Sequence, residues 1–225
     1  MKKVGDFWVP DIDLRRWAKW GKMRRKTLEY YGEGAGAKTE DIREALSLFE
    51  GGRVALDGGA NVGAYTRIML ERFETVYAFE PAPDTFEALD RNVRDWGLAE
   101  RVHLFQAALS DRSESVSMKG KPGHRSVTRR IVGKGDIPAM PIDELELPEL
   151  DFLKLDLEGY ESRALRGARE TLIRCRPYVL FEDKAHKTDL YGETREAHEF
   201  LESLGARLVA CVGGQQFDWL YGFRD

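Results

Sequence analysis

The amino-acid sequence predicts an α/β fold built on a mostly parallel sheet. Short apolar runs alternate with helical patterns, and this order requires crossover connections between parallel strands. The first run, residues 54–57, ends in a carboxylate and leads into the glycine-rich turn 58–63. Ligands bind at the carboxyl edge of such sheets, and the acids that end four of the runs should gather there: Asp57, Glu80, Asp156 and Glu182.

Length and composition suit one α/β domain with an appended segment. The chain has 225 residues, of which 42% are hydrophobic, and its formal net charge of −4 argues against a general nucleic-acid coat. The two cysteines, Cys175 and Cys211, lack metal-ligand spacing and are expected to be buried thiols, which fits a reducing compartment. The sequence shows no secretory signal and no apolar run long enough to span a bilayer. We therefore expect a cytoplasmic protein without a membrane span.

The first part of the chain differs from the rest. It holds three of the five tryptophans and a cluster of Lys and Arg, and the pattern over residues 12–31 predicts a helix. We therefore divide the chain into a basic, aromatic helical extension, residues 1–38, and one domain, residues 39–225, with a basic insert at 109–136. Two interpretations of the extension stay open. It either packs on the domain with a solvated charged face, or it forms an arm over the substrate or on an anion or nucleic acid.

Within the domain, the periodicity of apolar residues places the elements. Helices are expected at 39–49, 62–73, 84–96, 160–174 and 197–204. Strands are expected at 54–57, 75–80, 102–108, 151–156, 178–182, 207–212 and 217–221. Only a short link, Gly213-Gly214, joins the last two strands, so they are predicted to pair antiparallel. The insert should form a short hairpin through its apolar residues Val116, Met118, Val127, Ile131 and Val132.

The glycine-rich turn discriminates between two types of nucleotide cofactor. A glycine turn after the first strand, with an acid at the end of the second, is the arrangement that binds a ribose. The spacing G-G-x-x-x-G at residues 58–63 differs from the G-x-G-x-x-G of NAD sites. Asp57 directly before it would repel a pyrophosphate. A carboxylate there suits a ligand with ammonium and sulfonium charge, which is S-adenosylmethionine.

Four sequence blocks resemble the FkbM-type family of class I S-adenosylmethionine-dependent methyltransferases. They are L-D-G-G-A-N-V-G-A-Y-T at 56–66, A-F-E-P at 78–81, D-F-L-K-L-D-L-E-G-Y-E at 151–161 and R-P at 176–177. The resemblance covers roughly residues 40–223. It implies a Rossmann-like, seven-stranded, mostly parallel sheet in the order 3-2-1-4-5-7-6, with the last strand antiparallel and helices on both faces. One departure is Gly58, where the family usually has an apolar residue.

By matching position, the resemblance also implies a cofactor site. Its members would be Asp57, Gly59, Ala60, Asn61, Gly63, Thr66, Glu80, Pro81, Ala107, Ala108 and Asp156. The glycine-rich turn would hold the methionine part of S-adenosylmethionine, and Glu80 would accept both ribose hydroxyls. Ala107 and Ala108 would border the adenine. Asp156 would face the ammonium group or the methyl-transfer cavity.

The expected reaction is an in-line displacement at the methyl carbon by a substrate oxygen, which a nearby base assists. The candidate bases are Asp156, Glu158, Glu161, Glu182 and His186. Favourable charge at a helix N-terminus explains Glu158 and Glu161 equally well, and a loop histidine such as His186 is often incidental. Asp156 and Glu182 could hold a divalent metal through carboxylate oxygens, but the sequence contains no dense ligand motif, so no metal is assigned.

The insert is the expected contact for the methyl acceptor. Its basic residues, among them Arg129, Arg130 and Lys134, suggest a small polar or anionic substrate. We expect O-methylation of a hydroxyl in a glycan, nucleotide sugar or natural product. Two alternatives stay open: a methyltransferase that acts on nucleic acid or a nucleotide through the basic segments, and a non-catalytic binding or assembly module with the same fold. The sequence contains no signal for an oligomeric state.

Overall fold

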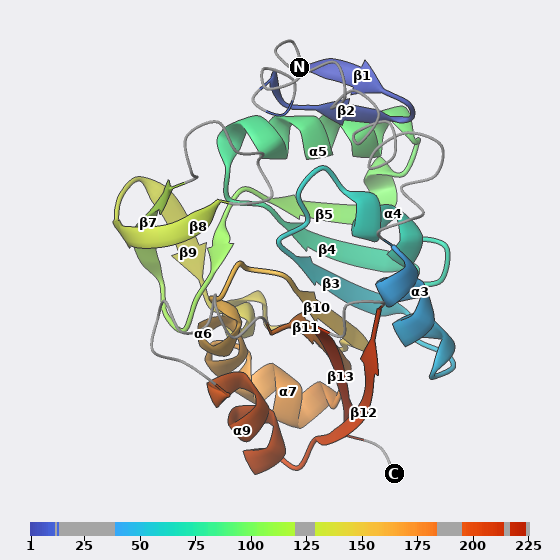
Figure 1. Cartoon of the computed structure of the whole chain (residues 1–225), viewed down its shortest axis with the longest axis vertical. Coiled ribbons are helices and arrows are strands. Elements are labelled where there is room, and N and C mark those ends of the chain that lie inside the picture. Colours follow the sequence, from blue (N-terminus) through green and yellow to red (C-terminus); the bar gives the residue numbers. More distant parts are fainter. Residues whose placement is uncertain (12, 14–38, 120–128, 184–194, 214–216, 224–225) are drawn as a thin grey trace.

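The computed structural model describes residues 1–11, 13, 39–119, 129–183, 195–213 and 217–223, and its centre is a seven-stranded sheet (Figure 1). The strands are β3 (Val54–Gly58), β4 (Thr75–Phe79), β5 (Val102–Phe105), β10 (Phe152–Leu155), β11 (Tyr178–Glu182), β12 (Arg207–Val212) and β13 (Asp218–Gly222). Their order across the sheet is β12-β13-β11-β10-β3-β4-β5. The strand β13 is antiparallel to both of its neighbours, and the pairs from β5 to β11 are parallel. The prediction of an α/β fold with a large, mostly parallel sheet is confirmed.

Helices cover both faces of this sheet. One face carries α3 (Glu40–Ser47), α4 (Ala64–Met69) and α5 (Pro83–Asp95), and the other carries α6 (Glu161–Arg166), α7 (Arg169–Cys175) and α9 (Glu196–Ser203). Successive strand residues point to opposite faces. Ala55 and Phe152 therefore pack with the first group of helices, whereas Leu56 and Leu153 pack with the second. These two apolar layers hold the carboxyl edge of the sheet in place.

The single helix expected over 160–174 is divided in two. Asp143, in the short 3-10 helix η4 (Ile142–Leu145), accepts hydrogen bonds from the backbone N–H groups of Glu170 and Thr171 at 3.0 and 2.8 Å. A distant carboxylate thus caps the start of α7, so a new helix begins there. The two cysteines are free, and both are half-buried rather than fully buried as expected.

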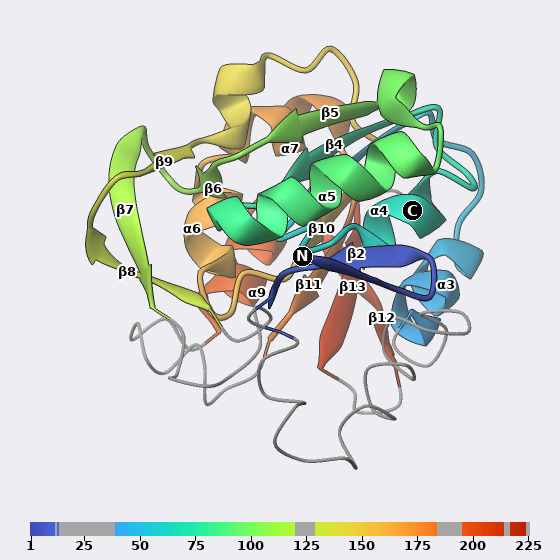
Figure 2. The same ribbon diagram turned by 90° about the horizontal axis from the view of Figure 1, so that it is seen from above.

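The insert forms a second sheet, which is larger than the expected hairpin. Its strands are β6 (Ala108–Leu109), β7 (Glu114–Lys119), β8 (Arg130–Lys134) and β9 (Ile137–Met140), in the order β6-β9-β7-β8. The antiparallel pair β7–β8 is the predicted hairpin, although Val127 lies outside the described residues. The strand expected over 102–108 ends at Phe105, and Ala108 belongs to the second sheet. Figures 1 and 2 show this sheet beyond the end of β5, beside α6.

The first nine residues form a hairpin that the sequence did not predict. Its strands β1 (Lys2–Val4) and β2 (Phe7–Val9) lie against α5 in both views (Figures 1 and 2). Asn92 on α5 donates to the carbonyl of Trp8 at 3.0 Å, and Phe7 makes an edge contact with Trp96. The predicted helix at 12–31 lies outside the described residues, so the division at residue 38 stays a prediction. Among the described helices, none has the length and apolar character required to cross a bilayer.

Candidate active site

The turn between β3 and α4 brings the ends of three strands together. Gly59, Asn61 and Gly63 have left-handed backbone conformations, with φ of 76°, 52° and 93°. A Cβ atom on Gly59 would lie 2.1 Å from the carbonyl oxygen of Asp156, so only glycine permits this close approach. The N–H of Gly59 donates to the carbonyl of Phe79 at 3.0 Å. The turn is therefore fixed to the ends of both β4 and β10.

A buried ion pair between Asp57 and Lys154 stabilises this turn. Asp57 is fully buried and is the register partner of Lys154 on β10, whose Nζ donates to it at 2.9 Å. Thr66 Oγ1 donates to the other carboxylate oxygen at 2.6 Å, and Lys154 also donates to the carbonyl of Gly59 at 3.1 Å. Burial alone would lower the pKa of Lys154, but the charges of Asp57 and Asp156 outweigh it and raise that pKa. The charge of Asp57 is thus balanced within the protein.

Glu80 follows β4 directly and faces the same turn. Its carboxylate is 6% exposed and accepts hydrogen bonds from the N–H groups of Asn61 and Ala82 at 3.0 and 2.9 Å. Burial raises the pKa of Glu80 to about 7, although these hydrogen bonds and the charges of Arg129 and Lys154 oppose the shift. Each carboxylate oxygen can accept a further hydrogen bond. The oriented carboxylate therefore fits a pair of neighbouring hydroxyl groups.

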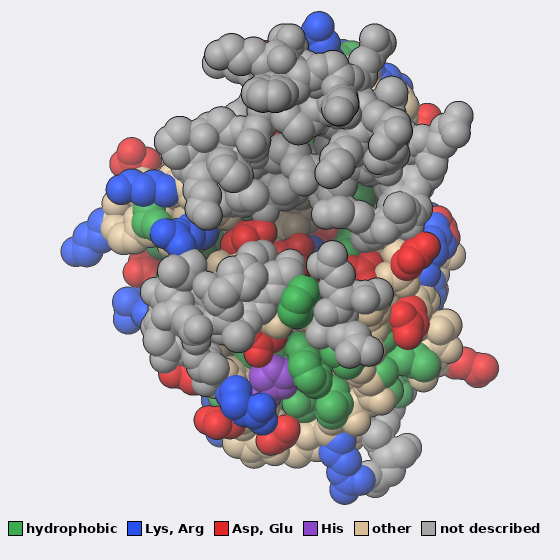
Figure 3. All heavy atoms as spheres, viewed as in Figure 1, with side chains coloured by type: hydrophobic (Ala, Val, Ile, Leu, Met, Phe, Trp, Pro, Cys, Tyr) green, Lys and Arg blue, Asp and Glu red, His purple; other side chains and the backbone are tan. Residues whose placement is uncertain are grey.

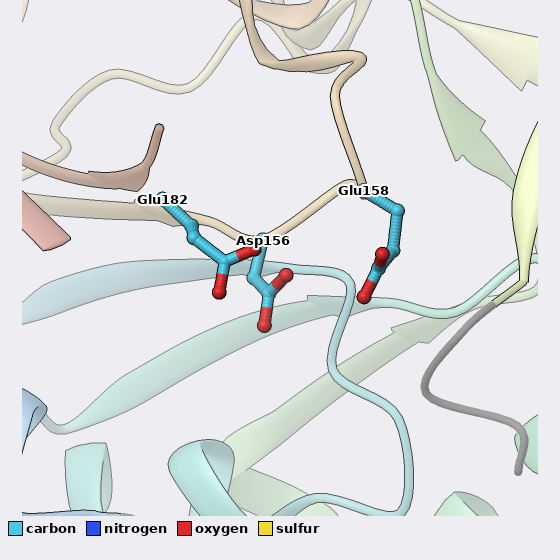
Figure 4. Close-up of side chains that lie close together, drawn as sticks. All are labelled: Asp156, Glu158 and Glu182. Atoms are coloured by element: carbon cyan, nitrogen blue, oxygen red, sulfur yellow. The ribbon is translucent and has the colours of Figure 1, made fainter. Parts of the chain in front are cut away.

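Three half-buried carboxylates lie at the ends of β10 and β11. Asp156, Glu158 and Glu182 each offer an oxygen atom, and these atoms all lie within 4.8 Å of one another. Figure 4 shows the three side chains pointing to the same side of the backbone. Glu158 has a φ of 58° and the next residue, Gly159, a φ of 100°, so the loop turns sharply at this point. The structure thus brings together three of the five candidate bases. Of the other two, Glu161 is buried next to this loop, and His186 lies outside the described residues.

A fourth carboxyl group, Glu161, is buried beside this loop. It is 2% exposed, and its Oε1 accepts the N–H of Leu157 at 2.6 Å. Within the described part of the chain, its Oε2 is buried and has no hydrogen-bond partner. Burial, reinforced by the charges of Asp156 and Glu182, raises the pKa of Glu161 to about 8 against the effect of two backbone hydrogen bonds. Burial therefore favours the protonated form of Glu161.

The residues predicted for the cofactor site all lie at or next to the carboxyl edge of β3, β4, β5 and β10. The predicted set is Asp57, Gly59, Ala60, Asn61, Gly63, Thr66, Glu80, Pro81, Ala107, Ala108 and Asp156. Asp57 and Thr66 hold the turn rather than face outward. Ala107 and Ala108 are 6% and 2% exposed, directly after β5, so their side chains are mostly covered. The part of each residue in cofactor binding stays a prediction.

Sequence reasoning missed three side chains of this region. Lys154 had a signal, because a charged residue interrupts the otherwise apolar strand β10. Arg129 pairs with Asp84 at the start of α5, with one contact of 2.7 Å, and was expected only as part of a basic insert. His198 on α9 contacts the hydroxyl of Tyr221 at 3.0 Å and a carboxylate oxygen of Asp183 at 2.9 Å. No local pattern marks this histidine, since it occupies an ordinary inward position of an amphipathic helix.

The face around the site divides into an acidic and a basic part. Figure 3 shows acidic side chains near the middle of the face and basic ones over β7 and β8. A cleft of about 440 Å³ opens along these two strands. Its polar lining holds four basic side chains, one acidic side chain and a tyrosine: Arg112, Arg130, Lys134, Arg163, Glu114 and Tyr160. Tyr160 follows the loop of Glu158, so the basic cleft adjoins the acidic cluster.

Comparisons with known proteins identify the family to which the chain is related. The family profile for the methyltransferase FkbM domain matches residues 57–208. The hexuronic acid methyltransferase AglP of Haloferax volcanii is 32% identical over 137 residues, which cover 58% of this chain and 56% of that protein. The 2-O-methyltransferase NoeI of Sinorhizobium fredii is 26% identical, with 73% of this chain and 80% of that protein covered.

The crystal structure of methyltransferase FkbM from Methylobacillus flagellatus has the same fold. Its TM-score is 0.55 at 22% sequence identity, and the match covers 83% of this chain and 47% of that chain. The present chain thus spans about half the length of that protein and of AglP. The matched family region includes the glycine-rich turn, Glu80 and the acidic loop. The chain belongs to the family defined by the methyltransferase FkbM domain.

Proposed function

We propose that this protein is an S-adenosylmethionine-dependent methyltransferase that methylates a hydroxyl oxygen of a small polar acceptor. The observation that carries the proposal is Glu80, a buried carboxylate held by two backbone N–H groups beside the glycine-rich turn. A carboxylate in this position at the end of the second strand is suited to accept both hydroxyls of a ribose. Membership of the methyltransferase family supports the same cofactor.

The charges at the carboxyl edge fit a cofactor with a cationic methionine tail. Asp57 is neutralised by Lys154, so Asp156 is the closer source of negative potential for an ammonium group. Gly59 to Gly63 would border the methionine part, and Ala107 and Ala108 the adenine. In this proposal Asp57 contributes by keeping the turn in its left-handed conformation, not by direct contact.

When bound, S-adenosylmethionine supplies a methyl group made electrophilic by the adjacent sulfonium. The chain itself must orient the acceptor and take the proton of its hydroxyl. Asp156, Glu158 and Glu182 are the described carboxylates placed for that proton transfer. His186 stays a predicted base. Glu161, with a pKa of about 8, is a poorer acceptor of that proton at neutral pH than an ionised neighbour.

The acceptor is best matched by a sugar with an acidic group. The cleft on β7 and β8 is predominantly basic and adjoins the acidic loop through Tyr160. Basic side chains favour carboxylate or phosphate groups. The names of AglP and NoeI refer to a hexuronic acid and to a 2-O-methyl transfer, and both support a hydroxyl of a sugar as the target. Arg130 and Lys134 would then bind the acid while a neighbouring hydroxyl reaches the methyl group.

Calorimetric titration with S-adenosylmethionine tests the cofactor. We expect saturable binding at pH 8, strongly weakened in Glu80→Gln because an amide cannot accept two ribose hydroxyls as a carboxylate does. Glu87→Gln is the matched control, since Glu87 is exposed on α5. The affinity should also fall as the pH drops from 8 to 6, because Glu80 gains a proton near pH 7. Unchanged affinity in Glu80→Gln would refute the assigned role, and an absence of binding would refute the proposed activity.

Transfer of labelled methyl groups tests the acceptor. Purified protein with labelled S-adenosylmethionine should methylate uronic-acid glycans in preference to their neutral counterparts. Arg130→Met and Lys134→Met should each raise the KM for acidic acceptors while leaving neutral acceptors unaffected. Arg94→Met, an exposed substitution on α5, is the control. Equal use of acidic and neutral sugars would remove the support for an acidic acceptor.

A further inference from the structure

The N-terminal hairpin packs against the glycine-rich turn, although it lies outside the matched family region, residues 57–208. Phe7 and Val9 on β2 are buried, with exposures of 3% and 0%. They form one apolar cluster with Val62 of the turn and Ala88 of α5. Figures 1 and 2 both show β2 alongside α5. The hairpin is thus part of the packing that surrounds the turn.

Asn92 connects the hairpin to the turn through hydrogen bonds. This side chain on α5 is fully buried. Its Nδ2 donates to the carbonyl of Val62 at 2.9 Å and to the carbonyl of Trp8 at 3.0 Å, and its Oδ1 accepts the N–H of Trp8 at 2.5 Å. Both amide hydrogens are used, one on each segment. The side chain therefore ties the position of the turn to that of β2.

A second connection runs through Trp96, which follows α5. The ring of Phe7 makes an edge contact with the Trp96 ring at 5.3 Å between centroids, and Trp96 Nε1 donates to the carbonyl of Asp6 at 3.3 Å. A Cβ atom on Gly63 would lie 3.1 Å from the Trp96 ring. Trp96 thus fills the space beside the left-handed Gly63, and the hairpin holds Trp96 in that place.

We propose that Asn92 is a positioning residue of the methyl-donor site, through which the hairpin of residues 1–9 controls the affinity for S-adenosylmethionine. This role rests on the proposed function, since it concerns the affinity for that cofactor. Val62 directly follows Asn61, whose N–H donates to Glu80 at 3.0 Å. A displacement of Val62 would therefore turn this N–H away from the carboxylate assigned to the ribose.

The hairpin would act by keeping the turn in its binding conformation before the cofactor arrives. A site that occupies its competent conformation for only a fraction of the time binds with an affinity reduced by that fraction. Asn92 and Trp96 hold the turn at two neighbouring residues, Val62 and Gly63. Asn92 would not touch the cofactor itself, because its amide is enclosed between the turn and β2.

Calorimetric titration of full-length variants with S-adenosylmethionine tests this role. Asn92→Asp keeps the size of the side chain and the acceptor for Trp8, but it loses both donors and places a charge against two carbonyls. We expect a Kd at least about tenfold higher than that of the wild type. Phe7→Ala, which loosens the hairpin without altering Asn92, should raise the Kd by about threefold or more. Lys3→Met is the control, since Lys3 is exposed on the same hairpin.

Hydrogen exchange followed by NMR separates positioning from general stability. Without cofactor, the exchange rates of the N–H groups of residues 59–63 should increase about tenfold more in Asn92→Asp than those of β10. S-adenosylmethionine should slow exchange of the Trp8 N–H in the wild type, because coupling between two sites is reciprocal, but not in Asn92→Asp. A merely structural role would change both regions together and leave Trp8 insensitive to the cofactor.

An unchanged Kd in folded Asn92→Asp and Phe7→Ala, or equal increases in exchange at residues 59–63 and at β10, would overturn the proposal. Circular dichroism establishes that each variant is folded, and Phe7→Ala carries the test if Asn92→Asp does not fold. If the wild type itself does not bind S-adenosylmethionine, the proposed function is refuted, and exchange without cofactor alone decides whether Asn92 positions the turn.

Discussion

Replacement of Lys154 by Met tests the claim that a buried ion pair supports the glycine-rich turn. The change removes the ammonium group from Asp57 and leaves the carboxylate with its hydrogen bond from Thr66. Both partners are almost fully buried, with side-chain exposures of 4% and 0%. Breaking a pair of this kind leaves an uncompensated charge in the interior and costs about 3–5 kcal/mol. We expect Lys154→Met to lower the free energy of unfolding by this amount.

Urea unfolding of a double-mutant cycle measures the interaction. Asp57→Asn should also destabilise the protein, because it leaves Lys154 buried without a carboxylate partner on β3. The double variant buries neither charge and should lose less than the two single losses added together, with a coupling energy of about 1–3 kcal/mol. Lys3→Met is the matched control, since Lys3 pairs with Asp95 at 3.1 Å on the surface, with exposures of 47% and 38%. That control should move the urea midpoint far less.

A loss of less than about 1 kcal/mol in Lys154→Met, or additive losses in the cycle, would refute a stabilising ion pair. Either result would mean that the lysine and the carboxylate do not stabilise one another. A stable Lys154→Met variant that has lost affinity for S-adenosylmethionine would have a different meaning. Lys154 would then act on the ligand itself rather than on the turn.

Three further variants test particular contacts. Gly59→Ala should lower the free energy of unfolding in urea by about 1–3 kcal/mol more than Gly97→Ala does. Both glycines have positive φ, but only a Cβ atom on Gly59 would meet backbone atoms. Equal losses would contradict the close approach of Gly59 to the backbone of Asp156. The raised pKa of Glu161 contributes stability that is fully present below pH 4.5 and is lost as the pH rises through about 8. The urea midpoint should therefore fall less between pH 5 and pH 9 in Glu161→Gln than in the wild type. Arg129→Met should lose about 1 kcal/mol, given the partial exposure of its pair with Asp84. A double variant with Asp84→Asn that loses the sum of the two single losses would show that the pair contributes little.

The main sheet was predictable because its signals are local. Each parallel strand is a short apolar run between turn residues, and four of the five have an acid at their carboxyl end. Glu80 and Asp156 could therefore be placed at one edge of the sheet from the sequence alone. The pairing of Asp57 with Lys154 could not, because it depends on the register between strands whose residues are 97 positions apart.

Elements that rest on distant contacts escaped prediction for the same reason. The strand β9 contains Pro138, which is atypical of a strand interior, and it gains its place by pairing with β6 and β7. The hairpin of β1 and β2 is only a few residues long and is held by Asn92, 84 positions away from Trp8. The unpartnered oxygen of Glu161, seen among the described residues, is a property of burial, which no spacing of acids in the sequence reveals.

The first and last strands of the second sheet, β6 and β9, pair with each other. The strands β6 and β9 pair in parallel, with Ala108 opposite Ala139 and Leu109 opposite Met140. The segments that leave and rejoin the main body thus lie side by side, and the chain between them, residues 110–138, is tethered as one cassette. A chimaera that exchanges this cassette would alter the walls of the basic cleft while leaving the glycine-rich turn and Glu80 intact. Under the proposed function, such an architecture would allow the choice of acceptor to diversify independently of the binding of the methyl donor.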